Sequence, residues 1–128
     1  MFVTIDVGDK RPIYQQVVDG IKALIAGGAL REGMTLPSVR QVAGDLGVNL
    51  NTIAGAYRQL QQEGLLSVRH GAGAVVAAQR SQTTDRNELL KPLRTALTEL
   101  VLAGWSDREI AAAARDELRA LRRKGDSR

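Results

Sequence analysis

The sequence predicts a mainly α-helical fold with one small β-hairpin wing: a winged helix-turn-helix followed by a two-helix C-terminal hairpin. Two short stretches with helical hydrophobic spacing, 38–46 and 49–64, are separated by a turn at Gly47. A β-hairpin pattern follows directly over 65–78, and two further amphipathic stretches end the chain. Together these three observations define the fold class.

The first helix is expected over 12–26, where apolar side chains recur on one face. These are Ile13, Val17, Ile21, Leu24 and Ile25. Pro12 suits the first helical position because it lacks a backbone N–H, and Gly27-Gly28 ends the helix. Residues 34–36 should be extended, because a residue that precedes proline is pushed out of the helical region.

The next two helices form the predicted helix-turn-helix. Ser38 and Gln41 make a capping box for the first of them, and Gly47 supplies the turn. Asn49 is a good N-cap for the second helix. The inner face of that helix consists of Ile53, Ala56, Tyr57 and Leu60. Two β-prone runs, 65–69 and 74–78, then flank a glycine-containing turn at 70–73, which completes a winged helix.

The chain divides into a winged-helix domain over 1–79, a polar linker over 80–87 and a helical dimerisation hairpin over 88–125. The first hairpin helix has apolar residues Leu90, Leu93, Leu97, Leu100 and Val101. Pro92 lies inside this pattern, so the helix either kinks there or begins there. The inner positions of the second helix, which starts at Asp107 after a capping box, are Ile110, Ala114, Leu118 and Leu121.

The apolar stripes of the hairpin are too wide for its two helices to bury against each other. A second copy of the same element would cover them in a two-fold four-helix interface, which predicts a homodimer. The alternative is that the hairpin packs back on its own winged helix. A two-fold dimer would present two helices to successive major grooves of a duplex, about one helical turn apart.

Composition narrows the function. The 128 residues include no cysteine and one histidine, which excludes disulfides, thiolate chemistry and a multi-histidine metal site. No nucleophile and base pair, phosphate loop or cofactor motif is present, so an enzyme is not expected. The apolar runs are too short to cross a bilayer, and a cytoplasmic location is expected. A net charge of +4 permits binding to nucleic acid phosphates without demanding it.

Over residues 12–78 the sequence resembles the GntR family of bacterial regulators. The resemblance is carried by LPSVR at 36–40, VNLNT at 48–52, AY at 56–57, EG at 63–64 and GAG at 71–73. The short tail with GWSDRE at 104–109 looks like the YtrA subgroup, in which a small helical element replaces a large effector domain. The resemblance implies a repressor that binds a palindromic operator in double-stranded DNA as a homodimer.

Carried over by motif, the resemblance also implies which residues contact DNA. The set is Arg40, Asn49, Asn51, Thr52, Arg69, His70 and Gly71. Arg58 is added to this set from its chemistry and not from a family motif. Asn51 and Thr52 would face the major groove from the start of the third helix, and Arg58 would contact phosphate. The wing residues His70 and Gly71 would lie near the minor groove.

The sequence departs from the family pattern at three places. Leu50 stands where relatives often have Arg or Pro, Ala54 where some have Arg, and Ala74-Val75 where Thr-Phe or Thr-Tyr is usual. Arginine makes the commonest bidentate contact with guanine, so its loss shifts specificity toward DNA shape.

A different class of function stays open alongside DNA binding. The winged helix could serve protein contacts only, in which case Arg40, Arg58, Arg69 and His70 would fall on different faces. The sequence also leaves room for an unknown small-molecule effector, which would bind at the dimer interface or between the domains because the tail is too short to enclose a pocket.

Overall fold

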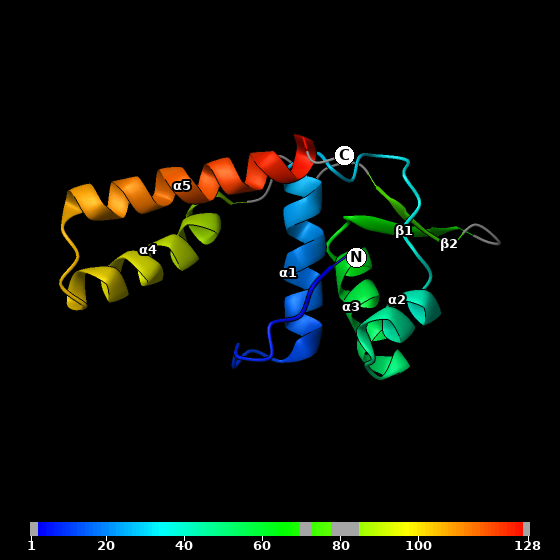
Figure 1. Cartoon of the computed structure of the whole chain (residues 1–128). Helices are drawn as coiled ribbons and strands as arrows, with labels where there is room; N and C mark the ends of the chain where they lie inside the picture. The colour runs from blue at the N-terminus through cyan, green and yellow to red at the C-terminus, as the bar shows by residue number, and fades with distance from the viewer. Residues whose placement is uncertain (1–2, 70–72, 78–84, 127–128) are drawn as a thin grey trace.

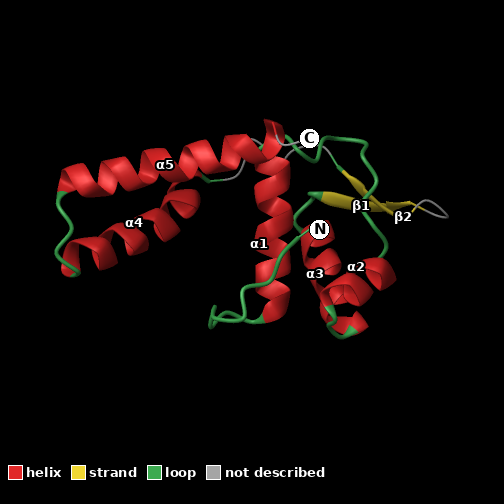
Figure 2. Cartoon of the chain, viewed as in Figure 1, coloured by secondary structure: helices red, strands yellow, loops and turns green. Residues whose placement is uncertain are grey.

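The computed structural model describes residues 3–69, 73–77 and 85–126 (Figure 1). Its helices and strands follow in the order α1 (Ile13–Ala26), α2 (Val39–Leu46), α3 (Leu50–Gln62), β1 (Leu66–Arg69), β2 (Gly73–Val76), α4 (Arg86–Leu102) and α5 (Asp107–Asp126). Figure 2 shows that helices dominate and that the strands form one small ribbon. This confirms the predicted fold class, a winged helix-turn-helix followed by two helices.

The core of the winged helix lies between α1, α2 and α3. α3 packs against both other helices, and it is followed directly by β1. The largest side chains with no exposure to solvent are Val17, Val18, Ile21, Val42, Ile53 and Leu60. Burying each of them contributes roughly 1.5–3 kcal/mol. The predicted inner face of α3 is confirmed, since all four of its residues are buried.

The wing is tied to the segment that precedes α2. β1 and β2 pair antiparallel, with Leu66 opposite Val76 and Arg69 opposite Gly73. The segment 34–36, which was predicted to be extended, adds to the other edge of β2. The backbone N–H of Leu36 donates to the Ala74 oxygen at 2.9 Å. These bonds fix the base of the wing relative to the start of α2.

Helix boundaries follow the predicted signals, with one correction. Pro12 is the N-cap of α1, with φ −55° and ψ 149°, and not its first helical residue. Ser38 caps α2 by accepting a hydrogen bond from the Gln41 N–H at 3.1 Å. Gly47 ends α2 with φ 68°, a conformation that glycine adopts without steric cost.

α4 starts two residues before the expected start of the hairpin at 88, because Asp85 caps it from within the expected linker. The structure also resolves the alternative at Pro92, since α4 runs through this residue instead of beginning there. α5 begins at Asp107 as predicted. Both halves of its capping box are formed: the Glu109 N–H donates to Ser106 Oγ at 3.1 Å, and the Ser106 N–H donates to Glu109 Oε1 at 2.9 Å.

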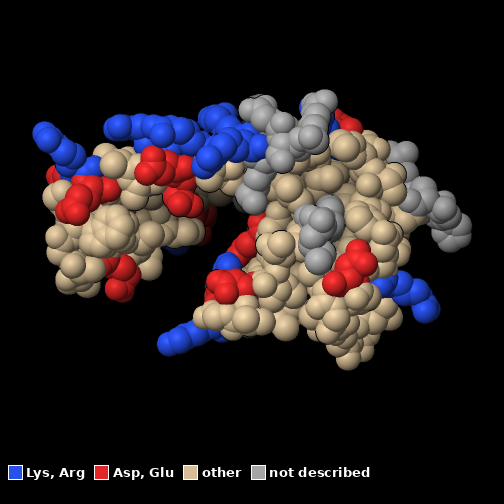
Figure 3. Space-filling view, in the orientation of Figure 1, with Lys and Arg blue, Asp and Glu red and all other residues tan. Residues whose placement is uncertain are grey.

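The hairpin projects sideways from the winged helix and touches it through the C-terminal end of α5, which packs on α1 (Figure 1). No residue of α4 is buried. Exposed arginines gather along the α5 side of the hairpin, at the upper edge of Figure 3. The exposed arginines of α5 are Arg108, Arg115, Arg119, Arg122 and Arg123. In the part of the chain that the structure describes, no helix is both long and apolar enough to span a membrane.

Candidate nucleic-acid interface

The outward face of α3 has polar side chains at its two ends and small residues in its middle. Residues 51, 55, 58 and 62 recur at helical spacing on the side opposite the buried face. Asn51 and Arg58 are exposed, and between them lie Ala54 and Gly55, which have little or no side chain. A partner can therefore approach the α3 backbone closely between the two polar groups.

A glycine inside a helix costs roughly 0.5–1 kcal/mol relative to alanine. Among the described residues no close contact requires Gly55, because a Cβ at that position would meet nothing within 4 Å. This is a signal that sequence reasoning passed over. Absence of a packing reason favours a functional one at the surface of α3.

Asn49 combines two capabilities at the start of α3. Its side-chain oxygen accepts a hydrogen bond from the Asn51 N–H at 2.7 Å, which confirms the predicted cap. Asn49 is nevertheless exposed, and its side-chain nitrogen can still donate to a partner. The cap thus holds a donor at the exposed end of the helix.

α2 is held against α3 by a buried tyrosine. The Tyr57 hydroxyl donates to the Pro37 carbonyl oxygen at 2.6 Å, immediately before the cap of α2. Burial raises the pKa of Tyr57 to about 12, so its hydroxyl stays protonated and continues to donate at neutral pH. This bond fixes the start of α2, and with it exposed Arg40, relative to the outward face of α3.

A hollow of about 320 Å³ lies where α2, α3 and the wing meet. Its lining consists of Ser38, Val39, Ala54, Tyr57, Arg58, Gln61, Val68, Gly73 and Ala74. Arg58 therefore lies beside both the wing strands and the residues next to Arg40. Arg69 is the last residue of β1, and the predicted wing residues His70 and Gly71 lie outside the described residues.

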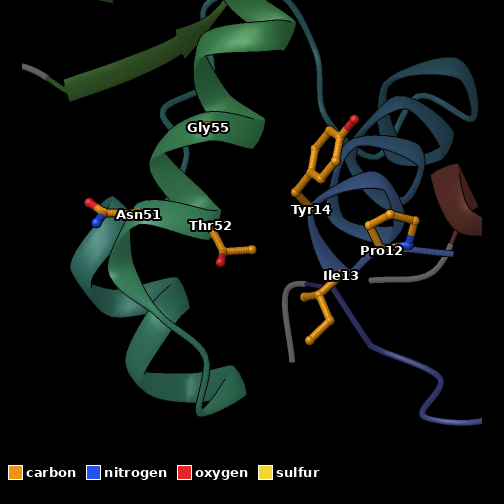
Figure 4. A pocket seen from close by; sticks show the side chains of 6 residues that line it. All are labelled: Pro12, Ile13, Tyr14, Asn51, Thr52 and Gly55. Atoms are coloured by element: carbon orange, nitrogen blue, oxygen red, sulfur yellow. The ribbon is translucent and has the colours of Figure 1, made fainter.

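A second hollow, of about 610 Å³, lies between the N-terminal end of α1 and the start of α3 (Figure 4). It is lined by Pro12, Ile13, Tyr14, Asn51, Thr52 and Gly55. Thr52 points toward α1, whereas Asn51 points to the other side of α3. The two residues were expected to share one face, and this expectation is corrected: Thr52 is only half-buried and borders the α1 side.

Ile13 was assigned to the buried stripe of the first helix, and this was wrong. It is 40% exposed, and its neighbour Tyr14 is 41% exposed, because both line the hollow next to α3. Periodicity placed Ile13 on the core side of the helix, but the core does not extend to the first turn.

The arginines on this surface differ from Arg11 and Lys22 elsewhere in the winged helix. Arg11 is held by Asp9 and Asp19, and Lys22 Nζ lies 2.8 Å from Glu63 Oε1. Within the part of the chain that the structure describes, neither Arg40 nor Arg58 has an acidic partner. Their charges are therefore available to an anionic partner.

Comparison with known proteins identifies the family. The sequence model of the bacterial regulatory proteins of the gntR family matches residues 13–76. The chain belongs to the GntR family. The match spans α1 to β2, the elements that build the surface described above.

Relatives extend the likeness to the hairpin. The HTH-type transcriptional repressor YtrA of Bacillus subtilis is 30% identical over 78% of this chain and 76% of its own. A structure described as a transcriptional antiterminator from Listeria monocytogenes has a TM-score of 0.84 at 30% identity, covering 95% of this chain and 92% of that one. The structure of YtrA from Sulfolobus acidocaldarius, a GntR-family transcription factor, has a TM-score of 0.63 at 39% identity, covering 77% and 99%.

These findings confirm the resemblance to YtrA-like GntR regulators. The chain is a DNA-binding transcriptional regulator of this kind, and the proteins it resembles are regulators and not enzymes.

Proposed function

We propose that this GntR-family chain represses transcription by binding a palindromic operator as a homodimer. The observation that carries the proposal is the common surface formed by the start of α2, the outward face of α3 and the wing, next to two unpaired arginines. In a winged helix, a surface of this kind enters the major groove with the start of its recognition helix. Repression would follow from occupation of the promoter.

The proposed DNA contacts divide by chemistry. Arg40 and Arg58 neutralise phosphates, which supplies affinity and salt dependence. Asn51 and Asn49 reach base edges from the start of α3, where amide groups pair with adenine. The wing supplies Arg69, His70 and Gly71. Because Ala54 and Gly55 carry no long side chain, α3 can approach the base edges closely, and DNA shape contributes to specificity.

The hollow between α1 and α3 extends this surface. Thr52 and Tyr14 border it from opposite sides, and the exposed Tyr14 ring lies beside the start of α3 (Figure 4). A DNA strand that flanks an inserted recognition helix passes next to that position. The proposal therefore adds the Tyr14 hydroxyl as a donor to a backbone phosphate, a contact without sequence preference.

The hairpin supplies the surface that binds the second subunit. Its large apolar side chains that stay exposed in one chain are Leu89, Leu93, Val101, Leu102, Trp105 and Leu118. Helical spacing places Leu89, Leu93 and Val101 on one side of α4, and an exposed apolar stripe of this kind marks an association site. We assign the chain a winged-helix domain over 1–79 and a dimerisation hairpin formed by α4 and α5, with the linker between them ending at the Asp85 cap and not at 87.

Selection of bound sequences from random double-stranded DNA, at a stated salt concentration, tests the proposal. The expected result is a palindrome whose half-sites are centred about one helical turn apart. Light scattering on the same sample should give the mass of a dimer. Recovery of unrelated sequences by a monomer would contradict the proposal and favour a protein-binding module.

A further inference from the structure

Two adjacent glycines end α1 for different physical reasons. Gly28 has φ +88°, a left-handed conformation that other residues rarely adopt, and open space surrounds it. Gly27 has φ −80° and ψ −8°, which every residue adopts readily. The backbone conformation therefore explains Gly28 and does not explain Gly27.

Close approach of another helix explains Gly27. A Cβ at this position would overlap the carbonyl oxygen of Leu121 in α5 and would lie 3.2 Å from its carbonyl carbon. Real Cβ atoms essentially never come within 3.0 Å of such an atom. Because both contacted atoms belong to the backbone, no side-chain rotation can relieve the overlap, and α5 would have to move.

This contact lies where the hairpin joins the winged helix. α5 packs on α1, whereas no residue of α4 is buried. Within α5 the contact is confined to the C-terminal end: Leu121 is half-buried, but Leu118, one turn earlier, is 54% exposed. The remainder of the hairpin extends away from this point (Figure 1).

We infer that Gly27 determines the spacing between the two DNA half-sites, by setting the angle at which the hairpin leaves the winged helix. The inference rests on the proposed function, because it requires dimerisation through the hairpin. If the hairpins of two subunits are joined, this angle fixes where each recognition helix lies. Gly27 is thus a positioning residue for specificity that does not itself contact DNA.

Because α5 is long, a small change in its tilt at Gly27 produces a large displacement of its other end. α5 has 20 residues, which corresponds to roughly 30 Å at 1.5 Å per residue. A tilt of about 10° at one end displaces the other by about 5 Å, which exceeds the rise of roughly 3.4 Å per base pair. A single methyl group at Gly27 can therefore change the preferred spacing by a base pair or more.

The test compares the wild-type chain with Gly27→Ala on a series of duplexes that carry two half-sites at separations increasing by one base pair. The variant should prefer a different separation, or show a flatter profile, and should bind the best wild-type duplex at least tenfold more weakly. The bases selected within a half-site and the dimer mass should not change. Ala26→Ser is the matched control, because it adds one atom to an exposed neighbour and should leave the profile as in wild type.

Leu121→Ala loosens the same junction but leaves the contacted backbone atoms in place. It shortens a half-buried side chain of α5 without adding bulk, so it should flatten the spacing profile while α1 keeps its sequence. This variant decides the question if Gly27→Ala does not fold. Profiles with an unchanged optimum and unchanged sharpness in both variants would overturn the inference. A wild-type chain that selects no paired half-sites would instead overturn the proposed function, and this is seen before any variant is measured.

Discussion

The winged helix and the hairpin have similar hydrophobic patterns in the sequence but differ in how far their apolar side chains are buried. In the winged helix, the apolar stripes of α1, α2 and α3 cover one another, and Val17, Ile21 and Ile53 are inaccessible to solvent. In the hairpin, an equally regular stripe leaves Leu93 49% and Val101 57% exposed. Hydrophobic periodicity identifies the apolar face of a helix but does not identify what covers it.

The two regions also differ in what defines their helices. Tertiary contacts fix the winged helix, including the Tyr57 bond to Pro37 and the pairing of segment 34–36 with β2. Local signals define the hairpin, chiefly the Asp85 cap and the Ser106 and Glu109 capping box. We therefore expect changes in the winged helix to alter folding stability and changes in the hairpin to alter association.

The largest effect is expected for Leu93→Asp in α4. Leu93 is half exposed in one chain, so the subunit should stay folded. In the proposed dimer the new carboxylate would be buried without a partner, which costs about 3–5 kcal/mol and weakens association on the order of 100-fold or more. Sedimentation at a series of concentrations measures this.

Thr95→Glu is the matched control for this change. Thr95 is exposed, and helical spacing places it on the side of α4 opposite Leu93. It adds the same charge and should leave the dimer intact. Equal dimerisation of both variants and the wild type would show that the apolar face of the hairpin is not the subunit interface.

The next largest effects concern the outward face of α3. Asn51→Ala should cost about 1–3 kcal/mol on the preferred site and relax base preference at one position per half-site. Arg58→Ala should weaken binding to all sequences alike and lower the salt slope by about one unit. Binding titrations at several salt concentrations distinguish the two patterns, and the reverse result would mean that the assigned roles are exchanged.

A loss of similar size, in folding stability and not in DNA binding, is expected for Tyr57→Phe, which removes the bond to the Pro37 oxygen. The loss should reduce the free energy of unfolding by about 1–3 kcal/mol, because a buried acceptor is left unsatisfied. Denaturant unfolding measures the change, and the dimer mass should not alter. An unchanged free energy of unfolding would show that this bond does not hold α2 against α3.

The same tyrosine predicts a dependence on alkaline pH. Its pKa in the folded chain is raised by burial from 10.0 to about 12, so the folded state holds this proton more tightly than the unfolded state. The contribution of Tyr57 to stability is therefore fully present below pH 10 and is lost as the pH rises from 10 toward 12. The difference in unfolding free energy between wild type and Tyr57→Phe should fall over this range, and a constant difference would exclude the effect.

The smallest effect is expected for Tyr14→Phe, which keeps the ring in the hollow beside α3 and removes its hydroxyl. Loss of one hydrogen bond from an exposed hydroxyl to a phosphate should cost about 0.5–1.5 kcal/mol, equally for every DNA sequence. Folding stability should not change, because Tyr14 is 41% exposed. A change in base preference would show that Tyr14 reads bases and does not merely contact the backbone.

Sequence reasoning was most successful where local chemistry decides the structure. The caps at Ser38, Asn49 and Ser106, the turn at Gly47 and the buried face of α3 were all predicted, since each depends on residues close together in the chain. It was wrong at Ile13, because the end of the core is set by packing between helices and not by the α1 pattern. It left Pro92 undecided, because the Asp85 cap lay unrecognised within the expected linker.

The candidate site could be predicted only in part. Family motifs gave the residues that start α2 and α3, and the structure shows that Arg58 lies beside the wing strands. The hollow formed with Tyr14 could not be predicted, because its two walls are far apart in the sequence and meet only through the packing of α1 on α3. The separate directions of Asn51 and Thr52 follow from the roughly 100° between neighbouring residues of a helix, but that Thr52 faces α1 depends on how α1 packs on α3.

The only tryptophan of the chain, Trp105, lies between α4 and α5, whereas both tyrosines lie in the winged helix. Since Trp105 is 41% exposed in one chain, its fluorescence emission should shift to shorter wavelength when the hairpin is covered. Excitation that selects tryptophan therefore reports on the hairpin alone. The natural sequence thus carries an optical probe of this region, and no label is needed to follow its association.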